Sequence, residues 1–416
     1  MKIAVMGQGY VGLPLAMAAV TAGHTVIGFE PAEERLLHLM NGKSYVDDVD
    51  DQALAGALLT GRYEPTRHPA ELADYDVAVI TVPTPLANGQ PDLSFVENAT
   101  RTLAAHLQAG ALVVLESTTY PGTTRDIVVP ILEKATGWTA GEDFHVGFSP
   151  ERIDPGNPAW TFGNTPKIVS GLTRGCRDLA ERFYAGITQC TVLAETLEEA
   201  ELAKVFENTF RHVNIALVNE LAQLAHVLGA DVWRTLDLAG TKPFGFAKFL
   251  PGPGVGGHCL PVDPVYLTHH ARTRHGHAVR LVELAQDINS VQPDYVVQRL
   301  QDGINQRHHL GMFGARILAL GAAYKPGTAD MRQSPALEVI RRLTAKGALV
   351  TVIDPSPMPN YVGITGSRVP DDLSHYDAVV LLTPHDEFDL QRVADGSAYV
   401  LDTRGVMPVA PHIERL

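Results

Sequence analysis

A stretch rich in glycine and proline contains the residue best suited to covalent chemistry. The stretch FLPGPGVGGHCLPVDPVY, residues 249–266, holds one cysteine, Cys259, and a carboxylate four residues later, Asp263. Glycine and proline at this density do not fit the interior of a helix or a strand, so we predict a shaped loop. A thiol on such a loop, near a carboxylate, suits nucleophilic attack on a carbonyl carbon. A tight turn between domains with a simply buried cysteine would give the same pattern.

A second group of polar residues lies on a predicted helix over residues 196–229. Lys204, Asn208 and Arg211 are spaced i, i+4 and i+7, which places them on one helix face. Such a row is ordinarily a solvated face. Asparagine, however, is a poor helix former, and a lysine–asparagine pair on one face could polarise a bound carbonyl oxygen.

The N-terminus carries a glycine motif between a predicted strand and a predicted helix. An apolar strand, residues 2–6, leads into GQGYVG and then a helix rich in small residues. The glycines allow a tight turn, close approach of a pyrophosphate and close packing of the helix. A second strand, residues 25–29, ends in Glu30, an acid placed to bind ribose hydroxyls and to repel a 2′-phosphate. The motif therefore predicts a Rossmann domain that binds NAD rather than NADP, with Gly7, Gly9, Tyr10, Val11 and Gly12 at the cofactor.

Three further apolar strands in this region each lead into a polar loop. The loops after them carry Thr84, Thr118 and Glu151, respectively. In an open parallel sheet, ligands bind beyond the carboxyl ends of the strands, so these side chains are candidates to face cofactor and substrate. Taken alone, a residue of this kind is more often an ordinary loop residue. The predicted strands are residues 77–82, 112–115 and 145–148, with closing strands at 168–171 and 191–193.

The remainder of the chain predicts helices and then a second α/β unit. A long helix over residues 278–305, with pauses at Pro293 and Gly303, would join the helix at 196–229 in a connecting core that, by analogy of fold, often forms a dimer surface. The C-terminal unit lacks a G-x-G-x-x-G motif but offers Lys325, Arg332 and Arg404 at predicted strand ends as cations for phosphates or carboxylates. Its predicted elements are strands at 316–321, 349–354, 378–383 and 399–402 and a helix at 334–347. The predicted domains are residues 1–195, 196–305 and 306–416.

Composition limits the class of protein. The 416 residues carry a net charge of -14, with 45% hydrophobic and 19% charged residues, which is typical of a globular protein and argues against general binding to nucleic acid or anionic membranes. Three cysteines, far apart, fit a reducing cytoplasm, where we expect Cys176 and Cys190 to pack as small apolar residues. Apolar runs stay short of a bilayer span. His258 lies beside Cys259 without a second pair at zinc spacing, so we predict no metal site.

Several motifs together resemble those of one family, the nucleotide-sugar 6-dehydrogenases, which includes UDP-glucose and UDP-N-acetylhexosamine dehydrogenases. The resemblance spans nearly the whole chain and is carried by GQGYVGLPLA, ESTTYPGTT, SPERIDPGN, AKVFENTFRHVNIALVNELA, PGPGVGGHCLPVDP and LGAAYKPGTADMRQSPA. It implies an NAD domain, a helical dimerisation core and a UDP-sugar domain in a homodimer. It also implies oxidation of a sugar C6 alcohol to a carboxylate with two NAD.

The resemblance also implies roles for individual residues. Cys259 would attack the C6 aldehyde to give a thiohemiacetal, which a second oxidation turns into a thioester for water to cleave. Lys204 and Asn208 would stabilise the oxyanion, Asp263 and Thr118 would position or activate water, and Glu151 would be a general acid or base. The expected further cofactor contacts are Glu30, Arg35, Thr84, Thr118 and Arg332. The expected substrate contacts are Glu151, Arg152, Lys204, Asn208, Arg211, Phe249, Gly256, His258, Lys325 and Arg404.

Departures from the family pattern bear on the sugar. UDP-glucose enzymes commonly carry lysine where this chain has Val262, and an arginine ahead of the cysteine loop where this chain has Lys242-Pro243-Phe244-Gly245. The pattern favours the UDP-N-acetylglucosamine branch and leaves UDP-glucose or a dTDP-sugar as alternatives. A two-electron hydroxyacid-type dehydrogenase would need no thiol and no second α/β domain. An inactive NAD-sensing protein would be expected to have lost Lys204 or the cysteine loop.

Overall fold

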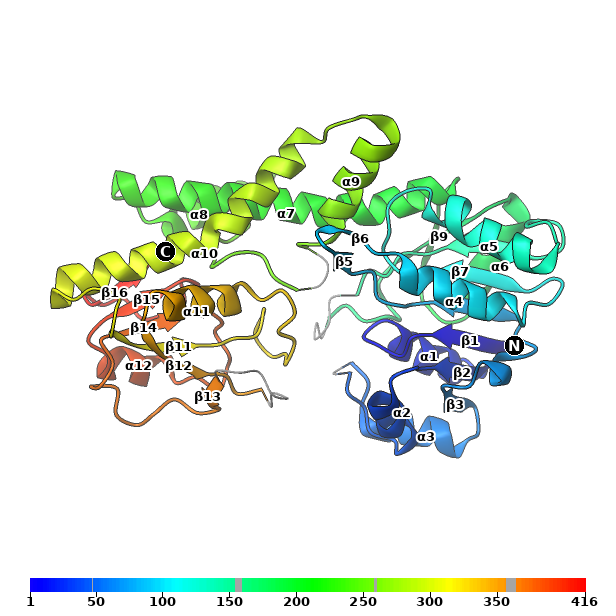
Figure 1. Cartoon of the computed structure of the whole chain (residues 1–416), viewed down its shortest axis with the longest axis horizontal. Helices are drawn as coiled ribbons and strands as arrows, with labels where there is room; N and C mark the ends of the chain where they lie inside the picture. The colour runs from blue at the N-terminus through cyan, green and yellow to red at the C-terminus, as the bar shows by residue number, and fades with distance from the viewer. Residues whose placement is uncertain (47, 154–158, 258–259, 357–363) are drawn as a thin grey trace. The chain divides into compact units, whose positions relative to one another are not determined.

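The computed structural model describes residues 1–46, 48–153, 159–257, 260–356 and 364–416. Two compact units account for the chain: Met1–Glu207 with Val265–His275, and Asn208–Pro264 with Gly276–Leu416. The chain therefore passes from the first unit to the second within one long helix and returns for a short segment after the cysteine loop. Figure 1 labels the elements of both units.

The first unit is built on a mostly parallel sheet with strand order β10-β9-β8-β7-β4-β1-β2-β3. The strand order reverses at β1, which pairs with both β2 and β4, and ligands of open α/β sheets bind at this kind of reversal. Among the described strand pairs of this sheet, β8 and β9 run antiparallel and the others parallel. The strands are β1 (Lys2–Met6), β2 (Thr25–Phe29), β3 (Tyr63–Thr66), β4 (Val77–Ile80), β7 (Leu112–Leu115), β8 (His145–Phe148), β9 (Lys167–Gly171) and β10 (Thr191–Leu193). All strands predicted for this region are present.

Helices on this sheet bury one continuous apolar face. Ile3 and Val5 of β1 pack in a cluster with Leu13 of α1 and with Ala180 and Phe183 of α6. Burial of a side chain of this kind stabilises the fold by about 1.5–3 kcal/mol. The remaining elements of the unit are α1 (Gly12–Thr21), α2 (Glu33–Met40), α3 (Asp51–Leu59), η1 (Pro69–Leu72), β5 (Leu86–Ala87), β6 (Gln90–Pro91), α4 (Ser94–Ala104), η2 (Thr124–Val128), α5 (Val129–Thr136) and α6 (Arg174–Ala185).

The two long central helices lie close to their predicted ranges, and two shorter helices that the sequence analysis did not predict lie between them along the chain. They are α7 (Leu197–Leu228), α8 (Val232–Gly240), α9 (Asp263–His275) and α10 (Arg280–His308). The predicted pauses in α10 are wrong, because the helix continues through Pro293 and Gly303. A Cβ on Gly303 would lie 2.1 Å from the Tyr399 hydroxyl, so glycine there serves close packing. The predicted loop over residues 249–266 is also too long, because Asp263 already begins α9.

The second unit contains a parallel sheet with strand order β13-β12-β11-β14-β15-β16. Alternate residues of its central strand face opposite layers. Ile317 and Ala319 pack with α10 and α11, whereas Leu318 and Leu320 pack with Val393 of α12. Figure 1 shows α11 and α12 on opposite faces of this sheet. The elements are β11 (Arg316–Leu320), α11 (Pro335–Ala345), β12 (Leu349–Ile353), β13 (Ile364–Gly366), β14 (Ala378–Leu381), α12 (Leu390–Gly396), β15 (Val400–Asp402) and β16 (Ile413–Arg415).

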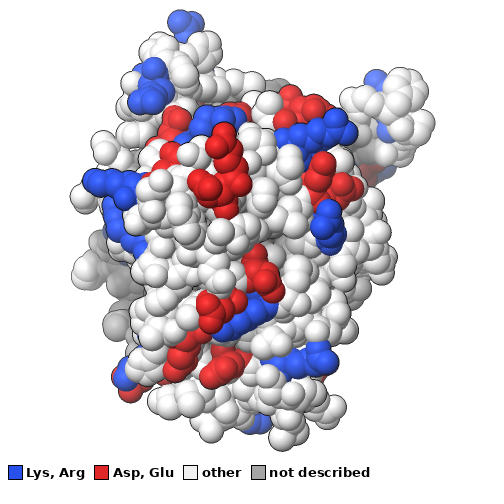
Figure 2. Space-filling model, turned by 90° about the vertical axis from the view of Figure 1, so that its right-hand side faces the viewer, with Lys and Arg blue, Asp and Glu red and all other residues white. Residues whose placement is uncertain are grey.

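Charge is mixed on the face drawn in Figure 2, where basic and acidic side chains lie beside one another. Within the described ranges, no helix combines the length and the apolar character needed to cross a bilayer. Cys176 is buried as expected, but the expectation for Cys190 is wrong, because this residue is exposed.

Candidate active site

The glycine turn after β1 is shaped for a phosphate-bearing ligand. Gly7 has a φ of 96°, which favours glycine, and a Cβ on Gly12 would lie 1.9 Å from the Gly7 carbonyl oxygen. A Cβ on Gly9, in contrast, would meet no atom within 4 Å. The backbone at Gly9 is therefore open to a ligand at the start of α1, where the helix N-terminus favours negative charge.

Glu30 follows β2 and turns its carboxylate back toward the glycine turn. Its Oε2 accepts a 3.2 Å hydrogen bond from the Gln8 backbone N–H, and its Oε1 accepts one of 3.1 Å from the Ala32 N–H. The residue is buried. The acid is thus fixed at the end of the strand next to the turn, as a ribose-binding acid requires.

The other predicted cofactor residues of the first unit lie around this edge of the sheet. Val11 is the N-cap of α1, and Tyr10 precedes it and packs partly buried against the main apolar cluster. The Arg35 guanidinium lies 5.6 Å from the centre of the Tyr45 ring. Thr84 and Thr118 are half-buried residues that follow β4 and β7.

Glu151 lies just beyond β8 in a buried charged cluster. Its Oε1 accepts hydrogen bonds from the backbone N–H groups of Arg152 and Ile153, and its Oε2 lies 3.2 Å from Nζ of Lys167. Arg152 is engaged elsewhere, because its Nη2 lies 2.6 Å from the Glu207 carboxylate and its Nη1 donates to the Pro166 carbonyl oxygen. This geometry supports a positioning role for Arg152 more directly than substrate contact.

The three polar residues predicted to share a face of α7 differ in burial. Lys204 and Asn208, one turn apart, are both buried, whereas Arg211 is exposed. Glu201, one turn before Lys204, is also buried and accepts hydrogen bonds from the N–H groups of Gly122 and Thr124 at 2.6 Å and 2.9 Å. Its carboxylate therefore fixes the end of the loop that carries Thr118.

Asn208 is paired with the carboxylate that follows the cysteine loop. Its Nδ2 donates a 2.5 Å hydrogen bond to Oδ2 of Asp263, and both residues are buried. Asp263 is the first residue of α9, so this hydrogen bond fixes α7 to the start of α9.

The cysteine loop packs against the C-terminal sheet domain through its glycines. A Cβ on Gly256 would lie 2.6 Å from Cδ of Pro335, and one on Gly252 would lie 3.0 Å from Nη1 of Arg404. The Gly257 N–H donates to the Arg332 carbonyl oxygen at 3.2 Å. Side chains at these glycines would push the loop away. His258 and Cys259 lie outside the described residues.

The predicted basic residues of the second unit lie beside this loop and the adjoining strands. Arg404 follows β15, donates to the Leu382 carbonyl oxygen at 2.6 Å, and has a pKa that burial lowers to about 10. Arg332 forms an ion pair of 2.6 Å with Asp330. Lys325 lies 5.9 Å from the centre of the Tyr324 ring, and Phe249 packs edge-on against Phe210.

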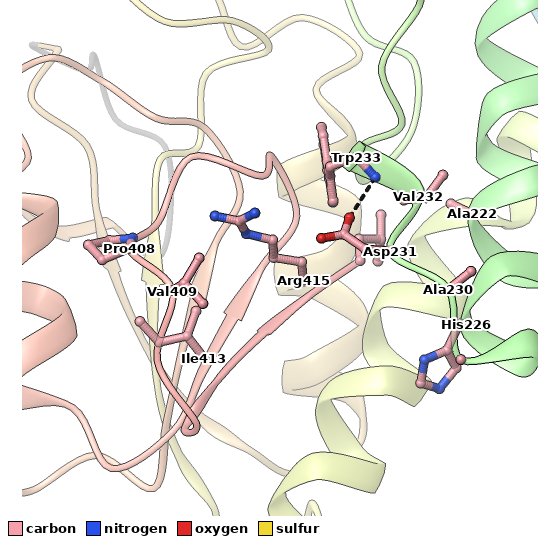
Figure 3. A pocket seen from close by; sticks show the side chains of 12 residues that line it. Ala222, His226, Ala230, Asp231, Val232, Trp233, Pro408, Val409, Ile413 and Arg415 are labelled. Atoms are coloured by element: carbon pink, nitrogen blue, oxygen red, sulfur yellow. Dashed lines mark hydrogen bonds between the residues drawn. The ribbon is translucent and has the colours of Figure 1, made fainter. Parts of the chain in front are cut away.

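The second unit also contains a hollow of about 320 Å³, which is lined by a different set of residues (Figure 3). Asp231 caps α8 there and accepts from the Trp233 N–H at 2.8 Å. None of the residues singled out from the sequence lines it. The lining residues are Ala222, His226, Gly229, Ala230, Asp231, Val232, Trp233, Pro408, Val409, Ile413, Arg415 and Leu416.

Comparison with known proteins matches three family models in order along the chain. They describe the UDP-glucose/GDP-mannose dehydrogenase family: its NAD-binding domain over residues 1–188, its central domain over 198–291 and its UDP-binding domain over 318–409. The chain belongs to this family. It is therefore an NAD-dependent nucleotide-sugar dehydrogenase, an oxidoreductase, with a nucleotide-sugar-binding domain.

Relatives of this dehydrogenase cover nearly its whole length. It is 38% identical to a UDP-N-acetyl-D-glucosamine 6-dehydrogenase of Pseudomonas aeruginosa, over 93% of this chain and 91% of the relative. It is 36% identical to a UDP-N-acetyl-D-mannosamine dehydrogenase of Pyrococcus horikoshii, over 93% of this chain and 90% of the relative. A solved structure of a UDP-D-ManNAc dehydrogenase from Pyrococcus horikoshii superposes with a TM-score of 0.91 at 33% identity, over 100% and 99% of the two chains.

Sequence reasoning missed the partners that hold the dehydrogenase residues in place. Lys167 forms ion pairs with Glu151 and Glu116, and Tyr184 donates a hydrogen bond to Glu116. Glu201 holds the loop after Thr118. A signal was present for Glu116, because an acid directly after an apolar strand is placed at the ligand-binding edge of a sheet. Lys167 gave no such signal, since its partners lie 16 and 51 residues away along the chain.

Proposed function

We propose that this dehydrogenase oxidises the C6 hydroxyl of a UDP-N-acetylhexosamine to the uronate, with UDP-N-acetylglucosamine as the favoured substrate. Two relatives at 38% and 35% identity act on that substrate by name. The buried Val262 in place of the lysine common in UDP-glucose enzymes supports the same choice. UDP-N-acetylmannosamine, the substrate named for the Pyrococcus horikoshii relative, is the alternative within this range.

The residues of the first unit fit the cofactor that the family requires. The open backbone at Gly9, the glycine-dependent contact of Gly12 and the oriented Glu30 carboxylate match a pyrophosphate and a ribose diol. Arg35, Thr84 and Thr118 would line the same edge, and Arg332 is a further proposed contact to the cofactor. NAD, when bound, supplies the hydride acceptor for both oxidations.

The first oxidation needs a base for the C6 hydroxyl and donors for its oxygen. We assign the base to Glu151, whose carboxylate is oriented by two backbone N–H groups. The ammonium of Lys204 and the amide of Asn208 would hold the oxygen as it becomes a carbonyl. Fixed donors of this kind stabilise charge that develops in the transition state.

The second oxidation needs a covalent intermediate, which we assign to Cys259. Its thiolate would add to the C6 aldehyde to form a thiohemiacetal, with the alkoxide stabilised by Lys204 and Asn208. Loss of hydride leaves a thioester. Water, positioned by Asp263 and Thr118, would cleave the thioester to the carboxylate and release the thiol. One alcohol and one water thus yield one carboxylate, two hydrides and three protons.

The single observation that carries this assignment is the Asn208–Asp263 hydrogen bond of 2.5 Å. It joins a residue of the proposed oxyanion site to the carboxylate four residues after Cys259, which supports a shared role for these two residues in the reaction. Lys325 and Arg404 would hold the substrate's diphosphate. Its sugar would be bound by Arg211, Phe249, Gly256 and His258. Arg152 would act on the substrate site indirectly, through its ion pair with Glu207.

We also propose a homodimer formed through α7, working in the cytoplasm, with three functional parts at residues 1–195, 196–305 and 306–416. The support for the dimer is a row of exposed apolar side chains at helical spacing along α7. Large exposed apolar patches on a folded chain mark interaction surfaces. The row consists of Phe210, Leu217, Leu221, Leu224 and Leu228, each at least 43% exposed in the single chain.

The test is the amount of NADH formed per limiting sugar. Assays would compare UDP-N-acetylglucosamine, UDP-N-acetylmannosamine, UDP-glucose and dTDP-glucose. Two NADH per UDP-N-acetylglucosamine, with that sugar giving the highest kcat/KM, is the expected result. One NADH per sugar would exclude the four-electron reaction. Cys259→Ser should abolish uronate formation while leaving NAD affinity unchanged, and continued uronate formation would remove the thiol from the mechanism.

A further inference from the structure

Three strand ends of the first unit bring two carboxylates and one ammonium together. Glu116 follows β7, Glu151 follows β8, and Lys167 is the first residue of β9. Nζ of Lys167 lies 3.0 Å from Oε1 of Glu116 and 3.2 Å from Oε2 of Glu151. The Tyr184 hydroxyl, from α6, donates a 2.6 Å hydrogen bond to the same Oε1 of Glu116.

The cluster is buried and holds one more acid than base. Glu116 is 0% exposed and Lys167 4%, while Glu151, at 9%, lies closest to solvent. With all three groups ionised, the cluster carries a net charge of -1 away from water, which is unfavourable. Uptake of one proton makes the cluster neutral.

The proton has a defined place on Glu116. Its Oε1 accepts from both Lys167 and Tyr184, whereas its Oε2 is buried with no hydrogen-bond partner. Protonation at Oε2 therefore breaks no existing hydrogen bond. Burial raises the pKa of Glu116 to about 7, against the opposing effects of Lys167 and Tyr184 and with a smaller contribution from Glu151. The two carboxylates raise the pKa of Lys167 despite its burial, so the lysine stays charged.

We propose that Lys167 and Glu116 form a buried proton relay for Glu151. The proposal rests on the proposed role of Glu151 as the base for the C6 hydroxyl. A proton taken from the sugar by Glu151 passes to Glu116, and Glu151 is again a carboxylate before the next proton transfer. Glu116 and Lys167 are positioning and proton-holding residues rather than groups that contact substrate.

The transfer balances without any further reactant. Protonated Glu151 gives its proton to Nζ of Lys167 as one N–H proton of the ammonium moves to Oε1 of Glu116. One O–H bond and one N–H bond break, and one N–H bond and one O–H bond form. Rotation of the neutral Glu116 carboxyl then exchanges its two oxygens and places the proton at the position that has no hydrogen-bond partner. Lys167 ends as an ammonium, Glu151 as a carboxylate and Glu116 as a neutral carboxyl. Both steps occur along hydrogen-bond distances of 3.0–3.2 Å. When product leaves, the same route returns the proton through Glu151 to solvent.

A purely structural role predicts something different. An ion pair that only ties the ends of β7, β8 and β9 together would let stability vary with pH as Glu116 ionises, but it would give the kcat of the folded enzyme no dependence on that ionisation. A relay requires an ionised Glu116 to accept the proton, so kcat must rise with pH as Glu116 loses its proton near pH 7. The pH dependence of kcat therefore separates the two explanations.

Two substitutions test this dependence. Glu116→Gln keeps an oxygen for Lys167 and Tyr184 and nearly the same side-chain volume, so the fold should persist. We expect a loss of ~10-fold in kcat at pH 8, below the 10²–10⁴-fold typical of a general acid–base residue itself, and loss of the rise near pH 7. Tyr184→Phe removes a hydrogen bond that lowers the Glu116 pKa, so the rise in kcat should move to higher pH. Unchanged kcat, or a uniform loss with an unchanged pH profile, would exclude the relay.

Infrared titration gives a readout that does not depend on activity. A buried neutral carboxyl has a carbonyl stretch that disappears as it ionises, and two such groups, Glu116 and Glu201, have pKa values raised to about 7 by burial. Glu116→Gln should remove one band and Glu201→Gln the other. A spectrum with no band lost in Glu116→Gln would contradict the assignment.

Glu151→Gln separates this proposal from the proposed function. If Glu151→Gln turns over like the wild type, the base assignment itself fails. If Glu151→Gln is inactive while Glu116→Gln behaves like the wild type, only the relay fails.

Discussion

Asn208 of α7 donates a 2.5 Å hydrogen bond to the carboxylate of Asp263, the residue that begins α9. Both side chains are buried, so water cannot replace either partner. An amide donor directed at a carboxylate is a charge-assisted hydrogen bond, roughly twice as strong as one between neutral groups. The pair therefore fixes the carboxylate after the cysteine loop to the helix that carries Lys204.

Asn208→Asp tests this pair with almost no change in shape. The substitution replaces the donor by a second carboxylate at hydrogen-bond distance, and two buried carboxylates this close cannot both be ionised. We expect kcat to fall about 10²–10³-fold, as for loss of an oriented donor to a developing oxyanion. Steady-state kinetics with saturating NAD measures the effect.

Asn98→Asp, on an exposed face of α4, is the matched control and should behave as wild type. NAD affinity should stay within about twofold in both variants, because the glycine turn is untouched. Wild-type kcat in Asn208→Asp would show that the pair serves packing alone.

Seven of the eight strands in the sheet of the first unit could be predicted because they are short apolar runs between strong breakers. The eighth, β3, carries Glu64 and Pro65 and gives no apolar run, so the sequence did not predict it. The end of the cysteine loop could not be predicted either. Asp263-Pro264 was interpreted as part of the loop because proline is frequent there, yet an acid followed by proline is also a helix start. In the structure Asp263-Pro264 is a helix start, since α9 begins at Asp263.

Spacing predicted which residues share a helix face but not how deeply each is buried. Lys204 and Asn208 are buried, and Arg211 on the same face is exposed. The Glu116–Lys167–Glu151 cluster could not be predicted from the sequence for a related reason. Its three residues approach one another only through the pairing of β7, β8 and β9, which no local pattern encodes.

Glu30→Ala should weaken NAD binding and relax discrimination against NADP. The change removes the acceptor for the Gln8 and Ala32 N–H groups and the partner for a ribose diol. We expect an affinity loss of about tenfold, equivalent to about 1.4 kcal/mol. Calorimetric titration with NAD and with NADP measures both effects, and Glu33→Ala, an exposed acid on α2, is the control. Unaltered NAD affinity would show that the ribose contacts another residue.

Glu201 makes stability depend on pH in a direction opposite to that of an ordinary paired carboxylate. Burial raises its pKa to about 7, despite hydrogen bonds from Thr124 and Gly122, whereas the unfolded value is about 4.3. The folded state then binds the proton more tightly. Its contribution to stability is full below about pH 4.3 and is lost as pH rises through 7, by roughly 4 kcal/mol in total.

Glu201→Gln removes this dependence, so the variant should gain stability relative to wild type on going from pH 5 to pH 8. Urea unfolding followed by fluorescence at both pH values gives the difference, and Glu142→Gln, on an exposed turn, controls for loss of charge. A constant difference between variant and wild type across this range would mean that Glu201 is ionised in the folded protein throughout.

The exposed apolar row on α7 predicts that a single charge would disrupt the proposed homodimer. Leu221 and Leu224 are 43% and 51% exposed in the single chain and lie one turn apart, so both would be buried if α7 packs against its copy. Burial of an unpaired carboxylate is strongly unfavourable. Leu221→Glu or Leu224→Glu should therefore shift the mass in multi-angle light scattering from dimer to monomer. Leu59→Glu, an equally apolar position on α3 that is 89% exposed, should leave the mass unchanged. A monomeric wild type would contradict the homodimer, and a dimer that tolerates both charges would place the interface away from this row.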